Sequence, residues 1–137
     1  MELIKMNTYN TTFENGADLK KANELLSSRL EDFNLWMDNS EAITLANGCE
    51  IGSINDLGLD IETVFSDDDD HDSELQYIRF LLSWGGPSDE IRFYPNGKIE
   101  YVYLDWFCGA GFDLTDNEEF QFIKDYFGID DLIYQEV

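Results

Sequence analysis

The sequence predicts an α+β fold in which an antiparallel meander of three to five strands packs with an N-terminal helix and a C-terminal helix. Two patterns carry this prediction. Apolar residues recur every three or four positions near both ends of the chain, as on one face of a helix, and they alternate with other residues through much of the second half, as along a strand. The length of 137 residues, with no repeat or linker in the sequence, predicts one acidic domain over residues 1–137.

The N-terminal helix is predicted from Ala17 to Met37, with Asn15 as its cap. Residues at spacings of three or four form its apolar stripe: Leu19, Ala22, Leu26, Leu30, Phe33 and Met37. A loop-rich stretch follows from Asp38 to Leu59. Within this stretch we expect a short strand at Ile43–Leu45 and one helical turn at Ser53–Leu57.

The second half contains the predicted strands, which are Asp60–Phe65, Leu75–Trp84, Glu90–Tyr94 and Ile99–Phe107. Gly85-Gly86-Pro87 ends the second strand in a sharp reversal, because glycine permits dihedral angles closed to other residues and proline interrupts a ladder. Asn96-Gly97 predicts a tight hairpin between the last two strands. The aromatic side chains around this hairpin, Tyr101 and Tyr103 among them, are expected mainly in the core.

The C-terminal helix has a local start signal. Thr115 and Glu118 match a capping box, in which each side chain bonds the backbone amide of the other residue. The expected buried stripe consists of Phe120, Ile123 and Phe127. Gly128 is expected to end the helix, and a polar tail containing Asp130 and Asp131 follows.

Charge is the strongest indication of function. Asp and Glu number 30 against 8 Lys and Arg, which gives a formal net charge of −22, and no basic residue lies between Arg29 and Arg79. Such a chain repels nucleic acid and anionic membranes and attracts basic surfaces. Its hydrophobic content of 43% and aromatic content of 15% predict a folded core and exclude disorder. Without a visible signal peptide or bilayer-length apolar run, the sequence predicts a cytoplasmic protein in which Cys49 and Cys108 are buried free thiols.

Motifs for catalysis or cofactor binding are missing from the sequence. The acidic run that starts at Asp67 fails as a calcium loop, because its sixth residue is Asp72 rather than Gly and its twelfth is Ile78 rather than Glu. His71 is the single histidine and lies within this run, which argues against a Ser-His-Asp or Cys-His arrangement. We therefore expect a protein that is not an enzyme and that carries no metal or cofactor.

Two short motifs carry a resemblance. Leu82-Ser83-Trp84-Gly85-Gly86-Pro87, followed by Tyr103-Leu104-Asp105-Trp106-Phe107, resembles a pattern in small, acidic, largely uncharacterised proteins of phages and mobile elements. The resemblance covers roughly Leu75 to Phe127. Such elements often encode inhibitors of host defence nucleases, including anti-CRISPR and antirestriction proteins that imitate DNA. The resemblance therefore implies an inhibitor.

The leading hypothesis is an acidic DNA or RNA mimic that blocks the basic groove of a nucleic-acid-binding protein, such as a CRISPR effector or a restriction enzyme. Duplex DNA carries about one charge per 1.7 Å, whereas carboxylates on one side of a strand repeat every ~6.6 Å, so two or three acidic elements must lie together. The expected contacts are Asp67, Asp68, Asp69, Asp70, Asp72, Glu74, Asp89, Glu90, Glu118, Glu119, Asp130 and Asp131. The alternative is an immunity protein that neutralises one toxin and is anchored by aromatics such as Tyr101 or Tyr103. A small metal-dependent enzyme is a third hypothesis.

Overall fold

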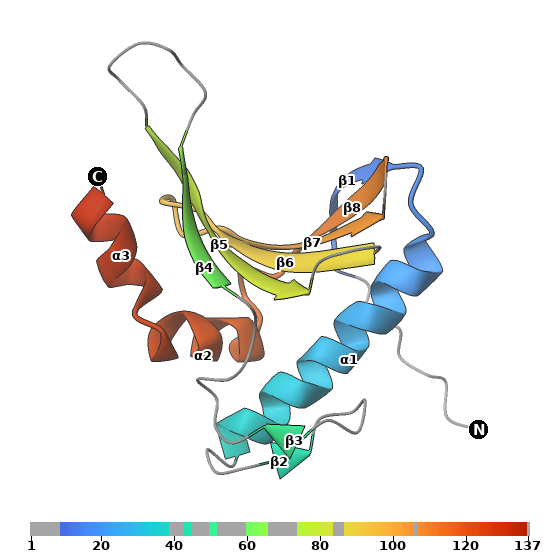
Figure 1. The fold of residues 1–137 in the computed structure, drawn as a ribbon, viewed down its shortest axis with the longest axis horizontal. Helices are drawn as coiled ribbons and strands as arrows, with labels where there is room; N and C mark the ends of the chain where they lie inside the picture. Colours follow the sequence, from blue (N-terminus) through green and yellow to red (C-terminus); the bar gives the residue numbers. More distant parts are fainter. Residues whose placement is uncertain are drawn as a thin grey trace.

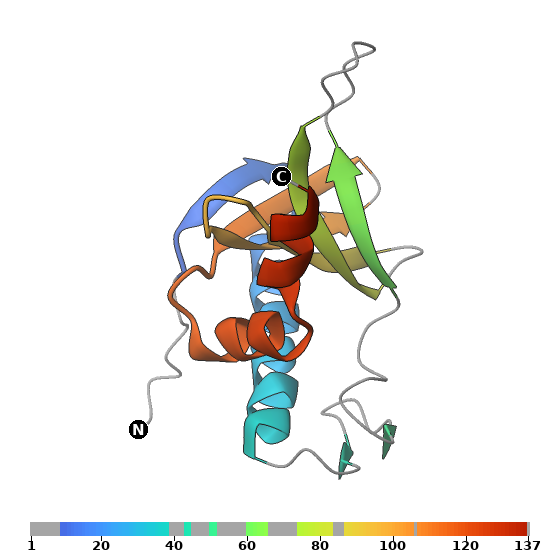
Figure 2. The same cartoon turned by 90° about the vertical axis from the view of Figure 1, so that its left-hand side faces the viewer.

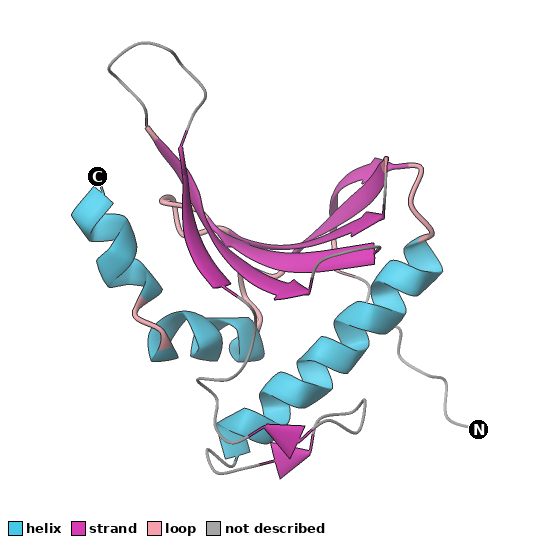
Figure 3. Ribbon diagram, viewed as in Figure 1, coloured by secondary structure: helices cyan, strands magenta, loops and turns pink. Residues whose placement is uncertain are grey.

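The computed structural model describes residues 9–38, 43–44, 50–51, 60–65, 74–83, 87–105 and 107–136. The helices and strands in chain order are β1 (Thr11–Asn15), α1 (Leu19–Asp38), β2 (Ile43–Thr44), β3 (Glu50–Ile51), β4 (Asp60–Phe65), β5 (Leu75–Ser83), β6 (Pro87–Phe93), β7 (Ile99–Asp105), β8 (Cys108–Asp113), α2 (Glu118–Tyr126) and α3 (Ile129–Glu136). The predicted α+β class is confirmed (Figure 3).

A six-stranded antiparallel sheet, in the order β1-β8-β7-β6-β5-β4, forms the centre of the fold. Strands β4 to β8 follow one another as a meander, and β1 adds to it beside β8 (Figure 1). The main sheet thus has more strands than the three to five predicted. Strands β2 and β3 pair separately, with Ile43 opposite Ile51, which confirms a strand at the start of Ile43–Leu45.

All three helices lie on the same side of the sheet, which is bent so that its other face is concave (Figures 1 and 2). The core fills the space between the helices and the sheet. Phe33 of α1 meets Phe120 of α2 edge-on at 5.4 Å between ring centroids, and Phe80 of β5 meets Phe127 at 5.0 Å. The described helices include none that is long and apolar enough to cross a bilayer.

Helix α1 begins two residues later than predicted. Its cap is Asp18, whose carboxylate accepts hydrogen bonds from the backbone N–H groups of Lys20 at 3.0 Å and Lys21 at 3.3 Å. Asn15, the predicted cap, instead ends β1, and Gly16 makes the turn between the two elements with φ 71°. The stripe from Ala22 to Phe33 is buried as predicted: Ala22, Leu26, Leu30 and Phe33.

The meander follows the prediction closely except at its end. Strand β4 has the predicted bounds, β5 covers the described part of the predicted strand, and β6 begins at Pro87 rather than Glu90. The hairpin at Asn96-Gly97 is confirmed, since Gly97 has φ 92° and its N–H donates to Tyr94 O at 3.0 Å. Trp84, Gly85, Gly86 and Trp106 lie outside the described residues, as does the predicted turn at Ser53–Leu57.

The predicted strand Ile99–Phe107 was too long, and β8 was not predicted. The chain reverses after Asp105, and Cys108 pairs back with that residue. The Gly109-Ala110-Gly111 segment has no apolar alternation, yet it forms a strand that pairs with both β7 and β1, and Thr12 and Phe13 of β1 lie against Gly111. A Cβ atom on Gly111 would come within 2.6 Å of the Phe13 ring. Cys108 is a free, half-buried thiol rather than a buried one, and Cys49 lies outside the described residues.

The predicted capping box at α2 is wrong. Asn117 caps the helix, with its Oδ1 accepting from the Phe120 N–H at 3.0 Å. Thr115 lies before the cap, where its Oγ1 accepts from Ile99 N–H at 3.1 Å and donates to Asp113 at 2.5 Å. Gly128 ends α2 with φ 63°, as expected, but the predicted polar tail forms α3.

Candidate acidic interaction surface

The structure separates the predicted contact residues into four groups. Asp67 to Asp70 and Asp72 lie outside the described residues. Asp89 and Glu90 are buried, whereas Glu74 is exposed just before β5. The remaining residues lie on the C-terminal helices, where Glu118, Asp130 and Asp131 are exposed and Glu119 is half-buried.

The prediction that Asp89 contacts a partner is wrong, because this residue lies in the interior of the fold. Its side chain is 0% exposed. Arg29 of α1 donates to both carboxylate oxygens, from Nε at 2.8 Å and Nη2 at 3.0 Å. Tyr101 and Ser83 donate their hydroxyl protons at 2.8 Å and 2.5 Å. The carboxylate therefore ties α1 to three strands of the sheet and is unavailable to a partner.

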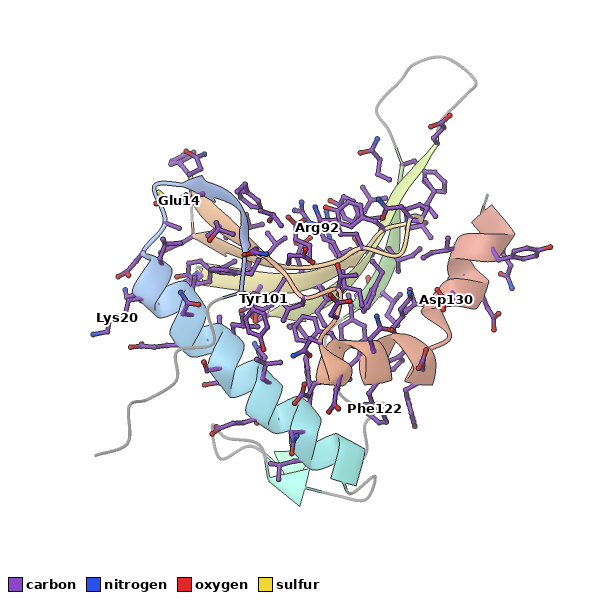
Figure 4. All side chains as sticks on the ribbon, turned by 180° about the vertical axis from the view of Figure 1, so that it is seen from behind. Glu14, Lys20, Arg92, Tyr101, Phe122 and Asp130 are labelled. Carbon is purple, nitrogen blue, oxygen red and sulfur yellow. The ribbon has the colours of Figure 1, made fainter. Side chains whose placement is uncertain are left out.

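The same prediction is wrong for Glu90, which is buried on the concave face of the sheet. Its carboxylate accepts from Arg92 Nε at 2.7 Å and from Arg79 Nε at 3.2 Å. The guanidinium carbon of Arg92 also lies 4.7 Å from the centre of the Tyr77 ring. Figure 4 shows Arg92 on the side of the sheet away from the helices. Glu90 thus neutralises arginines of its own chain.

Glu100 lies on the same concave face as Glu90 and continues its polar groups toward β1. It is 4% exposed and accepts hydrogen bonds from the hydroxyls of Thr12 and Tyr94, the latter at 2.6 Å. Burial, and then the bond to Glu100, raise the pKa of Tyr94 to about 12. The concave face is therefore held together by polar groups that satisfy one another.

Four basic residues of the described chain form ion pairs with acids of the same fold. Arg29, Arg79 and Arg92 are the arginines of the sequence, and each contacts a buried carboxylate. Lys124 is itself buried and contacts Asp130 Oδ1 at 3.1 Å. These cations are matched by acids of the same chain, so among the described residues the exposed acids carry most of the unbalanced negative charge.

The C-terminal helices carry a group of these exposed acids. At 1.5 Å per residue, Glu118, Glu119 and Asp125 lie within about 10 Å along α2. Their average axial spacing is about 5 Å, which is wider than the ~3.4 Å per charge of a single DNA strand, so α2 alone is sparser than DNA. Asp131 and Asp130, the latter paired with Lys124, continue the acidic surface onto α3. We call these five residues the acidic helical surface.

An acidic pocket of about 430 Å³ lies at the start of α2. It is lined by Tyr9, Asn10, Asp113, Leu114, Thr115, Asp116, Asn117, Glu118 and Glu119. Hydrogen bonds from Thr115 lower the pKa of Asp113, which keeps this carboxyl charged. Among the described residues, no group of three or more His, Cys, Asp or Glu side chains is arranged to hold a metal ion. The pocket's chemistry suits an organic cation, such as a lysine or arginine side chain.

The aromatic residues near this surface were not found by sequence reasoning. Tyr101 and Tyr103, the proposed anchors for a toxin, are 0% and 3% exposed and belong to the core, so they cannot serve as anchors. On α2, by contrast, Tyr126 is 44% exposed and Phe122 is half-buried. One feature of the sequence could have indicated them: Glu118, Phe122 and Tyr126 are spaced four residues apart, which places all three along one side of the helix.

Comparison of the chain with protein-family models, curated proteins and solved structures finds no match.

Proposed function

We propose that this protein binds the basic groove of a nucleic-acid-binding protein through the acidic helical surface and inhibits it by excluding the nucleic acid. The inhibitor acts in the cytoplasm as a binding protein rather than as an enzyme. Its targets are nucleases such as CRISPR effectors or restriction enzymes.

The observation that supports this proposal is the division of charge. The arginines are bound to acids inside the fold, whereas the acids of α2 and α3 are on the surface. Arginines and lysines that line a nuclease groove are spaced to meet phosphates. The carboxylates of α2 alone are sparser than the charges of one DNA strand, at about 5 Å against ~3.4 Å per charge, so the acids of α2 and α3 are needed together to take the place of a strand in such a groove.

The test is binding to a panel of purified CRISPR and restriction nucleases at rising salt, followed by competition with duplex DNA. We expect binding that weakens steeply with salt and that duplex DNA displaces. Affinity that is unchanged between low and high salt would contradict the proposal. Retention of a single toxin and of no nuclease would favour the immunity hypothesis.

Two charge variants distinguish a specific surface from a general effect of net charge. The first neutralises the helical surface with Glu118→Gln, Glu119→Gln, Asp125→Asn and Asp131→Asn. The matched control neutralises exposed acids elsewhere with Glu14→Gln, Glu24→Gln, Glu31→Gln and Asp60→Asn. Both variants remove four charges from the net −22.

The helical variant should lose about tenfold or more in affinity, because each exposed ion pair contributes about 0.2–1 kcal/mol. The control variant should lose much less. An equal loss in both variants would show that overall charge, rather than this surface, attracts the target.

A further inference from the structure

The exposed side of α2 combines aromatic rings with carboxylates. Glu118, Phe122 and Tyr126 succeed one another at intervals of four residues, and Glu119 and Asp125 flank them. The rings of Phe122 and Tyr126 are 6.1 Å apart with an interplanar angle of 39°. Figure 4 shows Phe122 on the side of α2 that faces away from the sheet. We call these five residues the aromatic-acidic stripe.

Imitation of phosphate charge requires carboxylates but no aromatic rings. Aromatic rings beside carboxylates suit a cation that is both charged and flat, because the ring face attracts the charge and the carboxylate accepts its N–H groups. Guanidinium meets both conditions better than ammonium, since it is planar and more weakly hydrated. The stripe therefore matches arginine more closely than lysine.

The same chain contains this arrangement internally. On the concave face, the guanidinium of Arg92 lies 4.7 Å from the centre of the Tyr77 ring and donates to Glu90 at 2.7 Å. There the ring and the carboxylate share one arginine of the same fold. On α2 the only basic residue is Lys124, which is buried and bound to Asp130, so it does not occupy the stripe.

We propose that the aromatic-acidic stripe receives arginine side chains of a basic protein partner. This inference rests on the proposed function and adds to it the groups that are recognised. Tyr126 and Phe122 present their rings to guanidinium groups, while Glu118, Glu119 and Asp125 accept the N–H donors. Charge complementarity selects a basic partner, and the rings select arginine within it.

The experiment compares fluorescein-labelled nona-arginine and nona-lysine peptides by fluorescence anisotropy, at the same salt concentration. We expect the arginine peptide to bind about fivefold more tightly, as cation–π contributions of this kind imply. Tyr126→Leu keeps an apolar side chain but removes the ring, and should bring the arginine-to-lysine ratio close to one. Tyr126→Phe keeps the ring and should preserve the ratio.

A matched control uses Tyr134, which is 84% exposed on α3 and lies outside the stripe. Tyr134→Leu should leave both affinities unchanged. Circular dichroism establishes that each variant is folded. Because Phe122 also packs against the core, Tyr126 is the decisive position.

The outcomes separate the two proposals. If both peptides and a basic nuclease bind but Tyr126→Leu leaves the arginine-to-lysine ratio unchanged, arginine recognition by the stripe is overturned and the acidic inhibitor stands. If neither peptide nor any nuclease binds, both proposals are overturned. A ratio that falls in Tyr126→Leu and Tyr134→Leu alike also rejects the stripe as the site.

Discussion

Replacement of Arg29 by Met is expected to lower the free energy of unfolding by about 3–5 kcal/mol, the typical cost of breaking a buried ion pair. Asp89 has no exposed surface and receives two hydrogen bonds from Arg29, at 2.8 and 3.0 Å. Met retains the apolar stem of the arginine but removes both donors and the positive charge. The remaining partners, Tyr101 and Ser83, are neutral hydroxyls and cannot balance the buried carboxylate.

Urea unfolding followed by tryptophan fluorescence measures this loss. The slope m should be the same in the wild type and the variant, which shows that both unfold in the same transition. Arg79→Met is the control, because Glu90 keeps Arg92 as a partner and Glu62 is partly exposed. We expect the control to lose about 1 kcal/mol or less. The double variant Arg29→Met/Asp89→Leu should recover most of the stability, since no buried charge remains. A loss below about 1 kcal/mol in Arg29→Met would refute the reasoning.

Two further predictions concern the sheet. Gly111→Ala should lower the free energy of unfolding by about 2 kcal/mol or more, because the new Cβ would meet the Phe13 ring. Gly97→Ala has open space around its Cβ and should lose only about 1 kcal/mol, through its φ of 92°. Equal losses in urea unfolding would contradict the steric explanation. Since burial and Glu100 raise the pKa of Tyr94 from 10.0 to about 12, its contribution to stability is present below pH 10 and is lost as the pH rises toward 12. Ultraviolet titration of tyrosinate, compared with Tyr94→Phe, should place this group near 12, and titration near 10 would show that its environment is different.

Alternation and turn chemistry were sufficient to predict β4 to β7, because each strand has its own local pattern and Asn96-Gly97 specifies a hairpin. Strand β8 has no such pattern. Its glycines are strand residues because their backbone pairs with β7 on one side and with β1, almost a hundred positions earlier in the chain, on the other. Local sequence patterns do not reveal pairing between segments so far apart, so the prediction lacked β8 and β1.

The candidate surface was predicted in part for a similar reason. An acid on a strand looks the same in sequence whether it faces solvent or an arginine, and the partner of Asp89 is 60 residues away. The acids of α2 lie outside the apolar stripe of a helix, which local periodicity does reveal. Phe122 was overlooked because large aromatic residues near a buried stripe are usually part of the core.

The buried pair of Arg29 and Asp89 affects how the fold responds to its ionic environment. Dissolved ions weaken the mutual repulsion of the exposed carboxylates, yet they hardly reach the pair between Arg29 and Asp89 in the interior. The folded chain should therefore become more stable in concentrated salt, under the same conditions that release a basic partner. Under the proposed function, the chain would dissociate from its target as an intact fold and bind again when the ionic strength falls.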